Sequence, residues 1–198
     1  MFLSSLSIGW RFVKERKTGS VSIYPFLATF TSSLLWLQYG IFKEDAVLII
    51  VSAVGISTSS LCILAYYHYT KNKSQVKRRV FLLAIFFCSF LVLVRHLTPE
   101  IASSILGVTS SFASVCMYAA PLVTVFEVIR TKSTISLSLP LSATSFVNCI
   151  LWLTYGYVFE DLFIIIPNSL GSLLTGFQLI LFMIYGRNVE HEIALIDV

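Results

Sequence analysis

Long apolar runs, separated by short polar segments, dominate the hydropathy pattern of the chain. Five runs each reach the roughly 20 residues that a membrane-spanning helix needs. They do not alternate apolar and polar residues as a lumen-lined strand does, so they predict helices rather than a barrel. The five runs are Ser22 to Phe42, Ala46 to Thr70, Ile101 to Phe126, Ser133 to Phe159 and Leu162 to Gly186.

Two shorter apolar runs complete the pattern. Val80 to Val94 is flanked by Arg79 and Arg95, whose charged heads can snorkel out of the hydrocarbon, so we expect a sixth span there. Met1 to Val13 is only partly apolar, stops at a basic stretch from Arg11 to Lys17, and predicts the back half of a seventh span whose front is missing. Its charges follow the apolar part and no small-residue cleavage site appears, which argues against a signal peptide.

Composition and charge support an integral membrane protein of defined orientation. Apolar residues make up 57% of the chain, charged residues 12%, and the mean hydropathy is +0.86. Twelve of the 14 basic residues fall on one side if the N-terminus is outside, which predicts a cytoplasmic C-terminus by the positive-inside rule. Because topology accounts for the net charge of +4, no nucleic-acid partner is expected.

The phrase LWLQYG at Leu35–Gly40 returns as LWLTYG at Leu151–Gly156, 116 positions later. The same offset aligns Trp, Tyr-Gly and Glu-Asp pairs without a gap, so the chain predicts a duplicated unit of three helices. A second copy in the same orientation needs one extra crossing, which gives seven helices as two parallel three-helix bundles joined by a linker helix, 3+1+3. The expected boundaries are 1–70 for the first repeat, 71–99 for the loop and linker helix, 100–186 for the second repeat and 187–198 for a cytoplasmic tail.

Prolines and one amide interrupt the apolar runs. Pro121 should kink the fifth helix, whereas Pro25 stands near a helix start, where it bends little. Pro167 should free the carbonyl of Phe163, and the neighbouring Asn168 is either a hydrogen-bonding contact between helices or a ligand contact. The repeat mate of Asn168 is Ser52.

Trp36 and Trp152 allow a similar choice. A Trp near a span end commonly anchors the headgroup interface. Each is followed three positions later by a tyrosine, Tyr39 or Tyr155, which lies closer to the surface and could be the anchor instead. The tryptophans would then present flat apolar rings to a pathway.

Catalytic and metal-binding patterns are missing from the sequence. Cys62, Cys88, Cys116 and Cys149 lie inside apolar spans without metal-like spacing, so we expect small buried hydrophobes. The three histidines form no cluster, and there is no phosphate loop or nucleophile elbow. We therefore expect neither an enzyme nor a bound metal or cofactor.

Several motifs together resemble the SWEET family of sugar transporters, particularly its animal members. They are W-x-x-YG, MY-x-x-PL, TKST and PN-x-x-G at these spacings, and the resemblance runs from Ser4 to about Tyr185. It implies that sugar binds midway between an Asn of the third helix and an Asn of the seventh, flanked by aromatic residues. The seventh-helix Asn falls on Asn168 and the sixth-helix Trp on Trp152, while Trp36 is assigned through the internal repeat.

The resemblance also implies hinges at four prolines. Pro25 and Pro121 match, Ser5 replaces the first proline, and Pro140 stands two residues after the last family position. Pro167 is a further candidate hinge from its place in the chain. Ser52 departs from the family by replacing the third-helix Asn with a shorter hydroxyl.

The implied function is facilitative, bidirectional uniport of mono- or disaccharides such as glucose by alternating access. No ionisable residue lies near the middle of a span, which favours passive transport over ion coupling. Alternatives are a non-transporting or partner-dependent subunit of the same fold, or a carrier of another small neutral solute. The plasma membrane and the Golgi both fit, and the sequence leaves a homo-oligomer or hetero-oligomer open.

Overall fold

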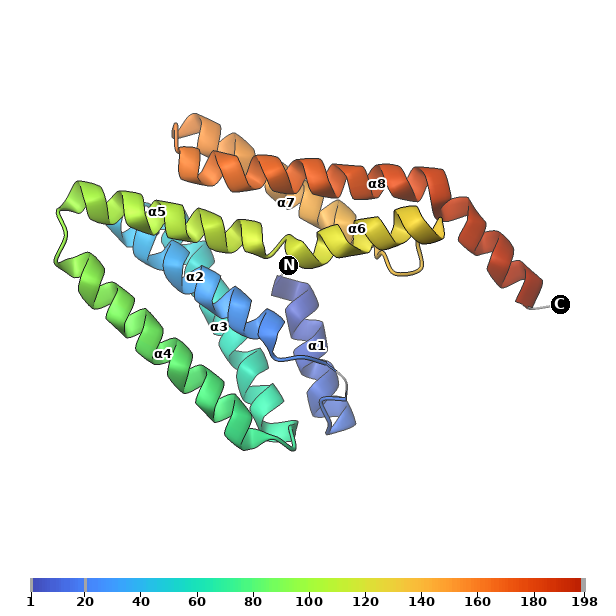
Figure 1. The fold of residues 1–198 in the computed structure, drawn as a ribbon, viewed down its shortest axis with the longest axis horizontal. Helices are drawn as coiled ribbons and strands as arrows, with labels where there is room; N and C mark the ends of the chain where they lie inside the picture. The colour runs from blue at the N-terminus through green and yellow to red at the C-terminus, as the bar shows by residue number, and fades with distance from the viewer. Residues whose placement is uncertain (1, 20, 197–198) are drawn as a thin grey trace. The chain divides into compact units, whose positions relative to one another are not determined.

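The structure, a computed structural model, describes the backbone of residues 2–19 and 21–196 and the side chains of residues 8–19 and 21–186. Across the described backbone the chain is entirely helical between turns, as the hydropathy pattern predicts (Figure 1). The helices are α1 (Phe2–Glu15), α2 (Tyr24–Phe42), α3 (Ala46–Tyr69), α4 (Lys73–Arg95), α5 (Pro99–Cys116), α6 (Ala119–Thr131), α7 (Leu139–Val158) and α8 (Leu162–Ile196).

The expected fifth span is two helices, because α5 ends just before Pro121. Pro121 has no N–H to donate to the carbonyl of Met117, four residues earlier, and the helix changes its hydrogen-bond pattern there. Met117 N–H is shared between the carbonyls of Ala113 at 3.3 Å and Ser114 at 3.2 Å. The kink predicted from Pro121 is therefore present, and α6 starts two residues before the proline.

The other prolines differ in their effect on the backbone. Pro25 and Pro140 lie in the first turns of α2 and α7, where a missing N–H costs no helical hydrogen bond. The predicted span began at Ser133, six residues too early, because α7 begins at Leu139. Pro140 interrupts no helix, whereas Pro167 lies inside α8.

Three stretches of described helix are long and apolar enough to cross a membrane, namely Ala46–Tyr69, Pro99–Thr131 and Leu162–Gly186. The remaining helices are shorter or carry more polar residues. Many of their large apolar side chains are nevertheless exposed, among them Phe86 and Leu151 at 67% and 65%. An apolar exterior of this kind suits lipid rather than water.

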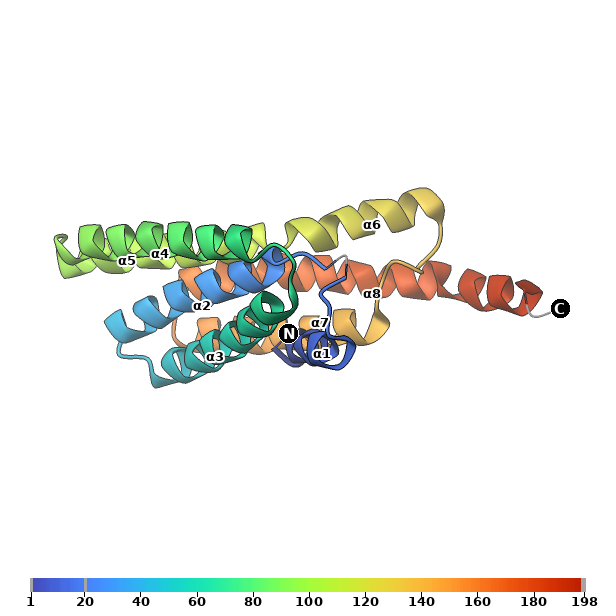
Figure 2. The same cartoon turned by 90° about the horizontal axis from the view of Figure 1, so that it is seen from below.

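The chain divides into two compact units, which we call the first unit (residues 2–110) and the second unit (residues 111 onward). In the first unit α3 contacts both α1 and α2, and in the second unit α8 contacts both α6 and α7. Figures 1 and 2 show the long contact of α2 with α3. The first unit is therefore built around α3 and the second unit around α8.

The phrase repeated in the sequence builds the same turn in both units. The N–H of Asp45 donates to the carbonyl of Gly40 at 2.9 Å, and the N–H of Asp161 donates to that of Gly156 at the same distance. The intervening Glu44 and Glu160 are left-handed, with φ of 54° and 53°. Both turns are Schellman caps that end one helix and lead directly into the next.

Glycine is required before each of these turns because the following helix packs closely against the backbone there. A Cβ on Gly40 would lie 2.9 Å from the Cβ of Leu48, and one on Gly156 would lie 2.9 Å from Cγ1 of Ile165. Glycine allows the following helix to fold back against the end of the preceding one. Tyr-Gly and Glu-Asp therefore recur together in the sequence repeat because they form one hairpin of two helices.

A second pair of turns repeats in the same register. Arg16 and Lys132 are also left-handed, with φ of 52° and 54°, and each follows the end of a helix. Among the described residues, the four non-glycine positions of positive φ are thus two pairs separated by the repeat offset.

Candidate functional site

Trp152 and Asn168 stand on either side of the turn between α7 and α8. Counted from Asp161, they are nine and seven residues away along the two packed helices. A rise of 1.5 Å per residue puts both about 10–14 Å from the turn, close to the middle of a hydrocarbon core about 30 Å thick. Trp36 and Ser52 have the same separations from Asp45 in the first unit.

Pro167 disturbs the hydrogen-bond ladder of α8 just before Asn168. The Ser111 hydroxyl donates to the carbonyl of Phe163 at 2.5 Å. This carbonyl is the one predicted to lose its helical donor because proline has no N–H. The prediction is confirmed, and the carbonyl is satisfied by a residue 52 positions away.

The side chain of Asn168 is half-buried. Its Nδ2 donates to the carbonyl of Ile164 at 2.8 Å, one turn back in its own helix. Its side chain makes no other hydrogen bond to the described residues. The interaction therefore sets the amide's orientation and does not link α8 to another helix. One N–H and the carbonyl oxygen remain available to a ligand.

Close packing supports α8 one turn beyond Asn168. Tyr118 Oη lies 3.7 Å from Cys149 Sγ, and both atoms face Gly171. A Cβ on Gly171 would lie 2.7 Å from that sulfur and would also clash with Tyr118. Sequence reasoning gave Gly171 no role, although its repeat mate Gly55 is also glycine and is also buried.

Each candidate tryptophan packs edge-to-face on the tyrosine that follows it. The ring centroids of Trp152 and Tyr155 are 5.5 Å apart, and those of Trp36 and Tyr39 are 5.7 Å apart. This geometry favours a defined ring orientation. Tyr39 is fully buried, at 0% exposure, so the prediction that it could be an exposed interfacial anchor was wrong.

Ser52 occupies the position of Asn168 in the first unit and is buried, at 6% exposure. Its hydroxyl makes no hydrogen bond to the described residues. It offers one donor and one acceptor where its repeat mate offers an amide.

A buried amide that sequence reasoning missed lies next to the kink at Pro121. Gln178 Oε1 accepts from the Ser142 hydroxyl at 3.0 Å, and Gln178 Nε2 donates to the carbonyl of Pro121 at 3.4 Å. We call this set the Gln178 bridge, and it joins α6, α7 and α8. The available signal was a second amide, after Asn168, in the same apolar run.

The cysteines show a mixed outcome. Cys62 and Cys149 are buried, as expected, but Cys88 and Cys116 are exposed. All four are free thiols. Within the residues that the structure describes, no three His, Cys, Asp or Glu side chains come together as a metal site would require.

Comparison with known proteins gives one consistent result. A family model described as "Sugar efflux transporter for intercellular exchange" matches residues 1–74 and 104–190. "Sugar transporter SWEET1" of Drosophila pseudoobscura pseudoobscura is 38% identical over 93% of this chain and 83% of its own length. The protein of the same name in Rattus norvegicus is 36% identical over 100% and 90%.

A plant relative and a solved structure extend this result. "Bidirectional sugar transporter SWEET7b" of Oryza sativa subsp. japonica is 31% identical over 97% of this chain and 75% of its own length. The solved structure of a eukaryotic SWEET transporter superposes with a TM-score of 0.87 at 24% identity, covering 94% of this chain and 90% of that one.

The solved structure establishes a shared fold, and the family match covers well over half of the chain in two segments. The family consists of membrane transporters rather than enzymes. From its helical fold, its paired W-x-x-YG turns and these matches, the chain belongs to the SWEET family of sugar transporters.

Proposed function

We propose that the chain carries a mono- or disaccharide such as glucose across a membrane by facilitative, bidirectional uniport. The observation that carries the proposal is the pairing of Asn168 with Trp152 at one depth of the α7–α8 hairpin. The amide has hydrogen-bonding capacity that no described residue uses, and the tryptophan ring is held by Tyr155.

This pairing matches the chemistry of a sugar. A sugar ring presents hydroxyls, which need neutral donors and acceptors, and C–H faces, which pack on flat aromatic surfaces. Asn168 and Ser52 are the proposed polar contacts, and Trp152 and Trp36 the proposed apolar ones. The names of the relatives, which include "Bidirectional sugar transporter", support this substrate class.

The placement of charge supports passive transport as the proposed mechanism. Glu127 and Arg130 lie toward the end of α6, and His68 lies in the last turn of α3. Ion-coupled carriers generally hold ionisable groups at membrane depth. The sugar would therefore move down its own gradient in either direction.

Alternating access requires bending, for which we propose the four prolines. Pro121 and Pro167 have the larger effect on helical hydrogen bonds, whereas Pro25 and Pro140 would act at helix starts. Ser5, which replaces a family proline, has its side chain outside the described residues.

We also propose the domain boundaries 1–70, 71–99, 100–186 and 187–198. The N-terminus would lie outside and the C-terminus in the cytoplasm, and the protein would reside in the plasma membrane or the Golgi.

The test is flux of radiolabelled glucose into and out of liposomes that contain the purified chain, without an ion gradient. Asn168→Ala should abolish flux in both directions while the protein remains folded and inserted. Asn148→Ala is the matched control, because Asn148 is an exposed amide on the adjacent helix α7. It should leave flux unchanged.

Equal flux in Asn168→Ala and wild type would remove Asn168 from the site. Flux that follows an imposed proton gradient would contradict the passive mechanism. Folded wild-type protein without flux of glucose or of a panel of other sugars would favour the non-transporting or partner-dependent subunit.

A further inference from the structure

A long groove runs between α4 and the helices before it in the first unit. Figures 1 and 2 show α4 leaving α3 at the turn that follows Tyr69 and diverging from it. The space between the two helices is a cavity of about 800 Å³, with a second of about 440 Å³ beside it. Ile63, Leu64, Val80 and Ala84 line both cavities, so the two form one groove, which we call the α3–α4 groove.

The walls of the α3–α4 groove are apolar over most of its length. The residues that α4 contributes run from Ser74 to Cys88. A helix of this length, from position 74 to position 88, extends about 21 Å, which exceeds the roughly 15 Å of hydrocarbon in one leaflet. An acyl chain of one leaflet therefore has a continuous apolar surface to lie against.

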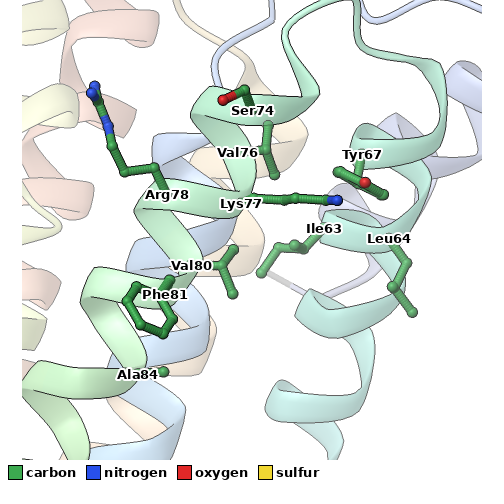
Figure 3. Close-up of a pocket in the computed structure, with 10 residues that line it drawn as sticks. All are labelled: Ile63, Leu64, Tyr67, Ser74, Val76, Lys77, Arg78, Val80, Phe81 and Ala84. Carbon is green, nitrogen blue, oxygen red and sulfur yellow. The ribbon is translucent and has the colours of Figure 1, made fainter.

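One end of the groove is strongly basic. The Nζ atoms of Lys73 and Lys77 lie 5.8 and 5.9 Å from the centroid of the same Tyr67 ring. Figure 3 shows the Lys77 side chain reaching from α4 across the groove toward Tyr67 on α3, whereas Arg78 extends away from that ring. Two ammonium groups thus lie near one aromatic ring.

These ammonium groups lack a carboxylate partner in the part of the chain that the structure describes. Arg11 and Glu15, by contrast, form an ion pair at 2.6 Å. The two positive charges repel each other, and an anion bound to both lysines would relieve that repulsion and form charge-assisted hydrogen bonds. Arg79 has a separate role, because its guanidinium stacks on Tyr24 at 4.5 Å and pins α4 to α2.

We propose that the α3–α4 groove binds one anionic glycerophospholipid. Its phosphate lies at Lys73 and Lys77, and one acyl chain lies along Ile63, Leu64, Val80 and Ala84. A basic pocket between membrane helices is the arrangement that recognises acidic lipid headgroups. The α4 wall of the groove from Val76 to Cys88 lies between the two segments that match the family model, residues 1–74 and 104–190, whereas its α3 wall lies inside the first segment.

The test is a lipid titration of the purified full chain in detergent, read by native mass spectrometry. Phosphatidylglycerol and phosphatidylcholine with identical acyl chains are compared. Wild type should bind phosphatidylglycerol more tightly. The double substitution Lys73→Gln/Lys77→Gln should weaken that binding by roughly 30-fold at low ionic strength, with less effect as salt is raised.

The matched control is Lys14→Gln/Lys17→Gln. It removes the same charge from exposed residues that do not line the groove, and it should retain the preference. Loss of preference in this control to the same extent as in the groove variant would overturn the proposal, because net charge would then account for binding. Equal affinity of wild type for the two lipids would also overturn it.

A second pair of variants tests the acyl-chain part. Ala84→Trp places an indole in the groove and should lower binding of phosphatidylglycerol and phosphatidylcholine alike. Leu82→Trp is the control, because Leu82 is 57% exposed and lines neither cavity. Unchanged lipid binding by a folded Ala84→Trp protein would contradict the site. A dimer in the same spectra that Ala84→Trp abolishes would instead make a second copy the occupant and overturn the lipid proposal.

Discussion

The two units share their turns but differ in how their helices are held together. Phe12, Phe26 and Cys62 form a buried apolar cluster in the first unit, and Gly9 packs against the sulfur of Cys62. The positions that correspond to Phe26 and Cys62 in the second unit are Ser142 and Gln178, which are joined by a hydrogen bond. One unit therefore has an apolar contact where the other has a polar one.

The apolar contacts of the second unit lie at neighbouring positions. Val125, Val128 and Leu181 form its buried cluster, at the places that Gly9, Phe12 and Ala65 hold in the first unit. Large and small residues are thus exchanged between the two copies, so that each interior is filled differently. Duplication preserved the helical framework and left the interior free to diverge.

The same contrast appears at the candidate site. Val51 and Ser52 continue the ladder of α3, whereas Pro167 and Asn168 interrupt that of α8 and present an amide. We infer that the second unit provides more of the substrate recognition and more of the bending.

Gly171→Ala should have the largest effect. The added methyl group would clash with Tyr118 and Cys149, and overpacking of this kind costs about 1–3 kcal/mol. We expect a lower melting temperature in detergent and loss of transport. Tyr118→Phe in the same chain should restore part of the stability. Gly186→Ala is the control, because the nearest atom to its new Cβ is 3.9 Å away. Equal melting temperatures of the two glycine variants would show that the packing around Gly171 is loose.

Exchanging the two polar site residues should change sugar affinity in opposite directions. Asn168→Ser should weaken binding and Ser52→Asn should strengthen it, since one hydrogen bond of this kind contributes about 1–3 kcal/mol, or roughly 5- to 150-fold. Equilibrium binding of labelled glucose measures both. Asn148→Ser is the control for the loss of an amide. If Ser52→Asn changed neither affinity nor selectivity, position 52 would not contact the substrate.

The Gln178 bridge should couple its two side chains energetically. Gln178→Leu leaves the Ser142 hydroxyl without this partner and should destabilise the protein by about 1–2 kcal/mol, whereas adding Ser142→Ala should cost little more. Thermal or denaturant unfolding of the four proteins of the double-mutant cycle measures the coupling. Strictly additive effects would mean that the two side chains do not share a hydrogen bond.

The two left-handed glutamates should give the smallest and most nearly equal effects. Glu44→Gly and Glu160→Gly should each stabilise the protein by about 0.5–1 kcal/mol, because glycine adopts positive φ without strain. Glu44→Ala and Glu160→Ala retain a Cβ and serve as controls for loss of the carboxylate. A clear difference between the two glycine variants in melting temperature would show that the turns differ energetically despite their matching geometry.

Much of the framework could be predicted from local features of the sequence. Long apolar runs mark helices because each helix satisfies its own backbone hydrogen bonds. The absent N–H of proline is a covalent property, so the freed carbonyl of Phe163 and the break before Pro121 followed without knowledge of the fold. The repeat and its motifs also led directly to the family.

Packing between distant segments decided the rest. The sequence could not show that Ser111 donates to Phe163, that Tyr39 is fully buried, or that Gln178 reaches both Ser142 and Pro121. Nor could it show that α4 diverges from α3 and leaves a basic-ended groove. An apolar run specifies that a helix is buried in lipid or protein, but the partner of each polar atom depends on which helices pack together, and those contacts join residues far apart in the chain.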